Sequence, residues 1–173
     1  MNLSSTYFYT ATILNWSHLL RMDVLKGEIV KSLEILVSRK KITVYGFVIM
    51  PNHIHLIWRN LEMNGKEFPD ESFKKFTSHV FKKELIKHDP IVLESFLVNK
   101  ADRQYQFWMR NALPIEIFSR EMLEQKLTYL HMNPLQTHWN LATDPNDYYH
   151  SSCSFYEQGD DKFRWLRDYR EDF

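Results

Sequence analysis

The stretch KITVYGFVIMPNHIHLIW (residues 41–58) consists of two apolar segments joined by Pro51 and Asn52. Each segment is rich in β-branched and aromatic residues, and the Pro-Asn pair is typical of a turn. The pattern therefore predicts a β-hairpin, with one strand over 41–50 and the next over 53–58.

The second of these strands carries two histidines within its apolar run. Successive side chains of a strand point to opposite faces, so His53 and His55 share one face. The other face carries Ile54, Leu56 and Trp58, which suit a core covered by helices. Residues two apart in a strand have Cα atoms roughly 6–7 Å apart, close enough for two neutral imidazoles to bind one divalent ion. The alternative is a half-exposed strand face without a ligand, and a metal site requires a third ligand from elsewhere in the chain.

The periodicity outside the hairpin predicts five further elements and a ferredoxin-like fold. In chain order they are a strand over 6–16, a helix over 21–37, a helix over 71–88, a strand over 104–110 and a helix from Ser119 to Pro134. The remainder is irregular, with one short helix after Ser151. The order β-α-β-β-α-β-α is that of a ferredoxin-like α+β domain, an antiparallel sheet with helices packed on one face.

Length, composition and charge exclude several classes of protein. The chain has 173 residues, of which 44% are hydrophobic, and this suits one domain with a substantial core. Neither GxxxxGK[ST] nor GxGxxG occurs, so the usual phosphate-binding loops are absent. The 22 basic and 22 acidic residues give a formal net charge of zero. This argues mildly against a nucleic-acid binder and leaves room for a local basic face.

Cysteine usage and the N-terminal sequence bear on the compartment. Cys153 is the single cysteine, which excludes an intramolecular disulfide and a CxxC metal site and suits a reducing cytoplasm. The N-terminus has no basic region, and Ser4, Ser5 and Thr6 interrupt any apolar run. No apolar run reaches the roughly 18 residues of a membrane span. We expect a cytoplasmic protein without membrane contact.

The segment EQKLTYLHMNPLQ (124–136) is the best source of a third ligand. On a helix its apolar residues form one narrow buried stripe, made of Leu123, Leu127 and Leu130. Tyr129 and Asn133 lie off this stripe and are four residues apart, so they share a second face. The Tyr129 hydroxyl is therefore expected at a surface or cleft.

Two residues of this helix are candidates for the chemistry around Tyr129. Asn133 offers an oxygen that would complete a His-His-Asn set around a hard divalent ion. Lys126 would lie near a phosphate or lower the pKa of the tyrosine. The alternative is that Tyr129 packs between helix and sheet and that Asn133 only ends the helix before Pro134.

Two stretches together resemble the single-tyrosine HUH transposases, in which U is a hydrophobic residue between two histidines. They are YGFVIMPNHIHLIW (45–58) and, about seventy residues later, KLTYLHMNPL (126–135). The similarity is greatest to the REP-associated tyrosine transposase branch, an insertion-sequence-200-type relative. Supporting segments are FWMRN (107–111) and YYHSSCSFY (148–156).

The resemblance implies a fold, a cofactor, a substrate and a set of site residues. The fold is a ferredoxin-like domain of the HUH nuclease type, the cofactor Mg²⁺ or Mn²⁺, and the substrate single-stranded DNA with hairpin structure. Residue by residue, the resemblance assigns His53 and His55 as metal ligands and Tyr129 as the nucleophile. Asn133 falls on the polar ligand one helical turn after the nucleophile.

The resemblance also bears on domain organisation and assembly. It covers roughly residues 5–156, so we assign a catalytic domain to 1–156. Residues 157–173 are a charged C-terminal tail that either belongs to this domain or follows it. Both a monomer and a homodimer are compatible with the sequence, and in a dimer Tyr129 of one chain would serve the histidines of the other.

These observations lead to one expected function and two alternatives. We expect a metal-dependent tyrosine transposase that cuts and rejoins single-stranded hairpin DNA through a 5′-phosphotyrosine intermediate. The first alternative is a domesticated protein that binds hairpin DNA without cutting it. The second is a metal-dependent phosphodiesterase in which water attacks and Tyr129 is structural.

The helix over 71–88 offers a candidate DNA-binding surface. Lys75, His79 and Lys82 lie opposite its expected core stripe of Phe73, Phe76 and Val80. Together with Lys126 they would neutralise phosphates. The alternative is an ordinary solvated helix face. On the strand over 104–110, Tyr105, Phe107 and Trp108 are candidates for stacking on unpaired bases if they are exposed, and core residues if they are not.

Overall fold

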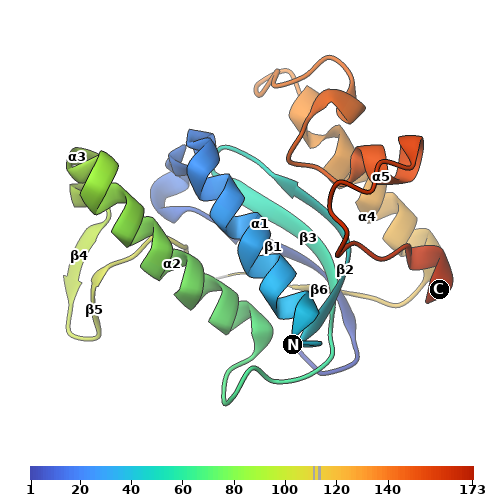
Figure 1. Cartoon of the computed structure of the whole chain (residues 1–173), viewed down its shortest axis with the longest axis horizontal. Coiled ribbons are helices and arrows are strands. Elements are labelled where there is room, and N and C mark those ends of the chain that lie inside the picture. Colours follow the sequence, from blue (N-terminus) through green and yellow to red (C-terminus); the bar gives the residue numbers. More distant parts are fainter. Residues whose placement is uncertain (111, 113) are drawn as a thin grey trace.

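The computed structural model describes residues 1–110, 112 and 114–173, and its centre is a four-stranded sheet (Figure 1). The strands are β1 (Thr6–Thr12), β2 (Ile42–Ile49), β3 (His53–Asn60) and β6 (Ile115–Ile117). Their order is β2-β3-β1-β6, and every neighbouring pair is antiparallel. The hairpin predicted over 41–58 is confirmed as β2 and β3, and so is the ferredoxin-like α+β fold.

Two long helices cover one face of this sheet. α1 (Asp23–Ser38) and α2 (Pro69–His88) run side by side in Figure 1. They bury apolar side chains against alternate residues of the strands, because side chains alternate across a sheet. The contributing residues include Leu25, Ile29 and Leu33 of α1, Phe73 and Phe81 of α2, and Ile54, Leu56 and Trp58 of β3.

The helix α4 (Arg120–Met132) packs on the opposite face of the sheet. Its predicted stripe of Leu123, Leu127 and Leu130 is buried there, against strand residues such as Phe8 and Ile57. Ser119 caps the helix by accepting a hydrogen bond from the Met122 backbone N–H, at 3.2 Å. The sheet therefore carries α1 and α2 on one side and the predicted tyrosine helix on the other.

A β-bulge in β2 lets α4 approach the sheet closely. Val44 pairs with Trp58 and Gly46 pairs with Ile57, so Tyr45 is the extra residue. A β-carbon built on Gly46 would lie 2.6 Å from Cδ1 of Leu127. Glycine at this position therefore provides the space that the leucine stripe of α4 occupies.

The prediction of a strand over 104–110 is only partly correct. Trp108 forms an antiparallel bridge with Ile13, just beyond the end of β1, but none of the strands in the described part of the chain spans the predicted range. β5 (Arg103–Tyr105) pairs with β4 (Leu97–Lys100) in a separate hairpin, after the short α3 (Pro90–Glu94), and the fourth strand of the main sheet is β6. Phe107 and Trp108 are buried, so neither is free to stack on a base. Asn111, the last residue of FWMRN, lies outside the described residues.

Trp108 also explains an error in the expected core stripe of α2. Its indole Nε1 donates a hydrogen bond to Oγ1 of Thr77, at 2.9 Å, inside the core. Thr77 is fully buried, and Phe81 follows it one turn later, whereas Phe76 is 42% exposed and Val80 only partly buried. The stripe of α2 therefore contains a polar residue, which an apolar pattern does not reveal.

The C-terminal part of the chain covers the outer edge of β2. Val48 forms a bridge with Ser151, and Val44 forms a parallel bridge with Leu166. The short helix predicted after Ser151 is α5 (Cys153–Gln158). The segment predicted as a charged tail, 157–173, contributes Phe163, Leu166 and Tyr169 to the packed interior. The connecting segments contain short 3₁₀ turns at Leu14–Trp16, Leu19–Arg21, Asn133–Leu135, Pro145–Asp147 and Tyr169–Glu171.

Among the residues that the structure describes, none of the helices combines the length and the apolar character that a bilayer crossing requires.

Candidate active site

The two histidines of β3 lie on the face of the sheet that α4 covers. His53 pairs with Thr12, and His55 with Thr10, on the neighbouring strand β1. Their ring centroids are 4.6 Å apart with an angle of 68° between the planes. Both side chains are buried, at 7% and 6% exposed. The two histidines are thus buried on the face of the sheet that α4 covers, and this part of β3 is not a solvated strand surface.

Each imidazole is oriented by a hydrogen bond at Nδ1. His53 Nδ1 donates to Oδ1 of Asn52, at 2.6 Å, and His55 Nδ1 lies 2.8 Å from Oγ1 of Thr10. Neither Nε2 atom forms a hydrogen bond in the described part of the chain, and neither is among its buried unpaired atoms. A histidine that binds a metal through Nε2 is usually held in this way through its other ring nitrogen.

Burial keeps both imidazoles neutral at neutral pH. It lowers the pKa of His53 to about 4, with a smaller contribution from the nearby His138. It lowers the pKa of His55 to about 3, helped by His53 and by the ammonium of Lys126. Since the neutral imidazole is the form that binds metal, the site is in its ligand form over the physiological range.

Tyr129 of α4 stands next to His55, in the same chain. The two ring centroids are 5.5 Å apart, and the ring of Phe8 lies between β1 and α4 at 5.1 Å from His55 and 5.9 Å from Tyr129. Tyr129 is 47% exposed and lies outside the buried leucine stripe. A single chain therefore brings the tyrosine to the histidine pair without a partner chain.

Lys126, one turn before Tyr129, lies on the same side of α4. Its Nζ is 5.2 Å from the centroid of the Phe8 ring, and its charge contributes to the low pKa of His55. The ammonium is thus close to the histidines and to the exposed tyrosine, where an anionic ligand would benefit from it.

Asn133 occupies the C-terminal cap position of α4. It is 2% exposed, and its Nδ2 donates to the backbone oxygen of Tyr129, at 3.5 Å. This contact ties the amide to the end of α4 and does not involve its Oδ1 atom. Within the described ranges no cluster of three or more His, Cys, Asp or Glu side chains could hold a metal.

The other predicted DNA-binding residues lie on the opposite layer of the molecule. Lys75, His79 and Lys82 belong to α2, whose buried side packs on the face of the sheet away from the histidines. Lys75 forms an ion pair with Glu67, at 2.6 Å. The Nζ of Lys82 lies 4.9 Å from the ring centroid of Tyr105. The structure brings Lys126 to the histidine pair and does not bring these three residues there.

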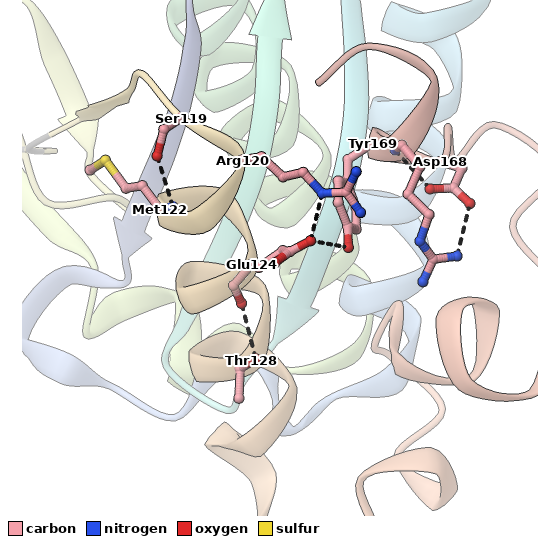
Figure 2. A network of polar contacts seen from close by, with 8 residues as sticks. Ser119, Arg120, Met122, Glu124, Thr128, Asp168 and Tyr169 are labelled. Atoms are coloured by element: carbon pink, nitrogen blue, oxygen red, sulfur yellow. Dashed lines mark hydrogen bonds and ion pairs between the residues drawn. The ribbon is translucent and has the colours of Figure 1, made fainter.

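Polar contacts on both sides of α4 fix its position, and the sequence did not indicate them. Figure 2 shows the carboxylate of Glu124 accepting hydrogen bonds from Arg120 Nε, at 2.9 Å, and from the Tyr169 hydroxyl, at 2.8 Å. Nearer the helix end, His131 Nε2 lies 2.9 Å from Oγ of Ser152. Ser152 belongs to the segment YYHSSCSFY, so that motif carries a structural role in orienting the tyrosine helix.

Charge is distributed unevenly over the segments that build this site. Residues 1–22, 35–61 and 125–143 contain no aspartate or glutamate, although they supply β1, the β2–β3 hairpin and the tyrosine end of α4. The acidic residues that bring the net charge to zero lie in other segments. A neutral total therefore coexists with a site free of carboxylates in its own segments, which suits an anionic ligand.

The comparisons with known proteins show a similarity of structure and none at the level of sequence families. No protein-family model matches the sequence, and no curated protein matches it. Among solved structures, a REP-associated tyrosine transposase bound to a REP hairpin superposes with a TM-score of 0.60 at 18% sequence identity. The match covers 96% of this chain and 88% of that chain. This chain thus shares the fold of a REP-associated tyrosine transposase over nearly its whole length.

Proposed function

We propose that the protein is a strand transferase that cuts and rejoins single-stranded DNA with hairpin structure. The observation that carries the proposal is the approach of the half-exposed Tyr129 to His55, beside a second buried and neutral imidazole, in one chain. Binding alone requires neither a nucleophile nor a pair of ligand-form histidines next to it.

Tyr129 is the nucleophile in this proposal. Its phenol oxygen attacks the phosphorus of a DNA phosphodiester and displaces the 3′ oxygen, so a 5′-phosphotyrosine bond forms and a free 3′-OH leaves. The phenol loses its proton in this step and the departing 3′ oxygen gains one, directly or through water, so the step balances. The new bond conserves the energy of the phosphodiester, so the 3′-OH of the same or another strand reverses the reaction without ATP.

His53 and His55 fit a divalent cation through their free Nε2 atoms, with the Asn133 amide oxygen as the third ligand. These residues would hold Mg²⁺ or Mn²⁺, and the ion would supply Lewis acidity at the DNA phosphate. Thr10 and Asn52 orient the imidazoles. Burial keeps both rings unprotonated, so the ligand set is ready without a proton being removed first.

Two further observations support an anionic DNA substrate. Lys126 places an ammonium near Tyr129, and the segments that form the site contain no carboxylate. The fold similarity is to a protein that was solved with a REP hairpin bound. We extend DNA contact to Lys75, His79 and Lys82 on α2, which form a separate surface. The salt dependence of DNA affinity tests this extension.

Two other functions remain distinct in their products. A metal-dependent phosphodiesterase would release free 5′-phosphate ends without a protein adduct. A domesticated hairpin-binding protein would bind DNA and leave it intact. The half-exposed side chain of Tyr129 and its place beside His55 favour transfer over both.

The test is the formation of a covalent adduct on a denaturing gel. The protein is mixed with labelled single-stranded hairpin oligonucleotides from the DNA around its gene, with Mn²⁺ or Mg²⁺. We expect an adduct that requires the metal and is absent from the Tyr129→Phe variant. A Tyr149→Phe variant, which changes another exposed tyrosine, should form the adduct normally. Cleavage without an adduct would replace the proposal with the phosphodiesterase, and binding without cleavage with the DNA-binding protein.

A further inference from the structure

Two consecutive non-glycine residues near the site have a left-handed backbone. Asn15 has φ 56° and ψ 26°, and Trp16 has φ 56°. Asparagine adopts this conformation fairly readily, but for a residue as bulky as tryptophan it is an outlier that costs free energy. The fold holds Trp16 in this conformation through a hydrogen bond from its N–H to the backbone oxygen of Ile13, at 3.0 Å.

The strained residue is not buried in return. The side chain of Trp16 is 60% exposed, whereas Trp58 and Trp108 are buried in the core. Backbone strain without burial of the ring contributes nothing to the stability of the fold. Strained positions of this kind concentrate at functional sites, where they present a side chain in a fixed direction.

A hydrogen-bonded chain links Trp16 directly to the candidate metal ligand. The amide of Asn52 donates from Nδ2 to the backbone oxygen of Trp16, at 3.3 Å, and its Oδ1 accepts from His53 Nδ1, at 2.6 Å. One side chain therefore fixes both the imidazole and the strained backbone. The backbone of Trp16 is therefore positioned relative to His53.

The surroundings of this loop are aromatic and free of carboxylates. The ring of Trp139 lies 6.0 Å from His53 and 5.6 Å from His18, two residues after Trp16. The loop and the segment of Trp139 belong to the stretches 1–22 and 125–143, which contain no acidic residue. The margin of the site next to His53 thus combines flat apolar rings with an absence of negative charge, and this suits an unpaired nucleotide better than another protein surface.

We infer that the indole of Trp16 stacks on an unpaired nucleobase and so holds the nucleotide next to the phosphate that is bound at His53 and His55. The inference rests on the proposed function, which it extends by naming the residue that positions the single strand. Stacking uses the π-face that every base has, so Trp16 selects an unpaired base over a paired one and does not read the sequence. Hydrogen bonds to Ile13 and from Asn52 hold the backbone of Trp16 in place before the DNA arrives, which reduces the ordering that binding requires.

The test combines variants of Trp16 with abasic positions in the DNA. Equilibrium affinity for the labelled hairpin oligonucleotide is measured without metal, by fluorescence anisotropy, so that no cleavage takes part. We expect Trp16→Ala to weaken binding about 5- to 150-fold and Trp16→Phe to retain most of the affinity. Phe118→Ala, at a phenyl ring that is 79% exposed, is the matched control and should bind as the unchanged protein does.

An abasic scan identifies the stacked nucleotide. At one unpaired position, removal of the base should weaken binding by the unchanged protein and have no further effect on Trp16→Ala, because both changes remove the same contact. Trp16→Gly relieves the left-handed strain and is expected to fold at least as stably, yet to bind as weakly as Trp16→Ala. It replaces the alanine variant should that one fail to fold.

The outcomes separate this inference from the proposed function. Normal adduct formation by the unchanged protein, together with unaltered affinity in both Trp16→Ala and Trp16→Gly, would overturn the stacking role alone. A change in oligomeric state on sedimentation, without loss of DNA affinity, would make Trp16 a contact between copies of the chain and also overturn it. Failure of the unchanged protein to bind any hairpin oligonucleotide would overturn the proposed function, and the stacking role with it.

Discussion

The phenol ring of Tyr129 and the imidazole of His55 lie 5.5 Å apart, centroid to centroid, although they come from a helix and a strand that are distant in the sequence. Two layers of contacts hold this approach. Beneath it, Thr10 and Asn52 orient the histidines, and above it, the position of α4 depends on the close passage at Gly46. Each of these supports can be removed separately, and each removal has its own expected result.

Replacing Thr10 with valine should weaken metal binding without unfolding the protein. Valine keeps the shape of threonine but cannot take part in the hydrogen bond to His55 Nδ1. Loss of such an orienting contact typically lowers metal affinity roughly 10- to 100-fold. Titration calorimetry with Mn²⁺ measures the change, and Thr10→Ser, which keeps the hydroxyl, should bind as before. Equal affinities for the valine and serine variants would show that this hydroxyl does not orient a ligand.

Substitutions of Asn133 distinguish a metal ligand from a helix cap. If its amide oxygen binds the metal, Asn133→Ala should lower the Mn²⁺ affinity about tenfold or more, while Asn133→Asp retains an oxygen ligand and most of the affinity. Both variants lose the Nδ2 contact to the Tyr129 backbone, so both should lose some stability. A loss of stability in both, with Mn²⁺ affinity unchanged in both, would reduce Asn133 to a capping role.

Lys126 should contribute a phosphate contact that salt can reveal. Its ammonium lies beside Phe8 and close to Tyr129, so Lys126→Gln should weaken binding of the hairpin oligonucleotide and reduce the slope of log affinity against log salt by about one. The surface proposed on α2 makes the same prediction for Lys75→Gln and Lys82→Gln. Slopes that change for Lys126 alone would confine DNA contact to the α4 face.

Filling the space at Gly46 should destabilise the protein through α4. The methyl group of Gly46→Ala would meet Leu127 Cδ1 at 2.6 Å, and overpacking of this kind typically costs about 1–3 kcal/mol. Urea denaturation measures the loss. Leu127→Val shortens the opposing side chain, so the double variant should be more stable than the sum of the two single changes predicts. If the stability losses of the two single variants simply added in the double variant, the added methyl group would not be in steric conflict with Leu127.

Acid should destabilise the protein through its buried histidines. Burial lowers the folded-state pKa of His131 to about 4, below the unfolded value of about 6.5. Between these two values the unfolded chain binds a proton that the folded chain does not, so stability falls as pH falls, by up to about 3 kcal/mol. His131→Gln keeps a polar side chain opposite Ser152 and should flatten the pH dependence of urea unfolding over this window. If the free energy of unfolding depended on pH in His131→Gln as it does in the unchanged protein, His131 would be excluded as a source of the acid destabilisation.

The hairpin and three long helices were predictable because their side-chain periods are strong. In the strands of 41–58 and in the leucine stripe of α4, the spacing of apolar residues shows directly which side chains are buried. The aromatic segment at Phe107 and Trp108 misled the prediction in part, because a buried extended segment with a single bridge, to Ile13, has the same composition as a full strand. The true fourth strand, Ile115–Ile117, is too short to show a period. The burial of Thr77 was not predicted, because it depends on a hydrogen bond from Trp108 and not on the polarity of threonine itself.

The candidate site was predictable only in part, for a similar reason. The spacing of His53 and His55 and the offset of Tyr129 from the leucine stripe follow from local geometry, and the structure places these side chains together. Their orienting partner Thr10 is fixed by the pairing register of β1 with β3, which the sequence does not display. The left-handed backbone conformation of Trp16 could not be predicted from the sequence either, because the residue type gives no indication of it.

The covering of β2 by the C-terminal part of the chain has a consequence for solubility under stress. Without Ser151 and Leu166 beside it, β2 would present an unpaired strand edge, the kind of surface on which chains join into aggregates. A protease that cut between α5 and Leu166 would free the part of that edge beside Val44, while Ser151, the histidines and α4 would stay on the molecule. Precipitation would then precede loss of helical content, and the last residues of the chain would be recognised as its protection against self-association.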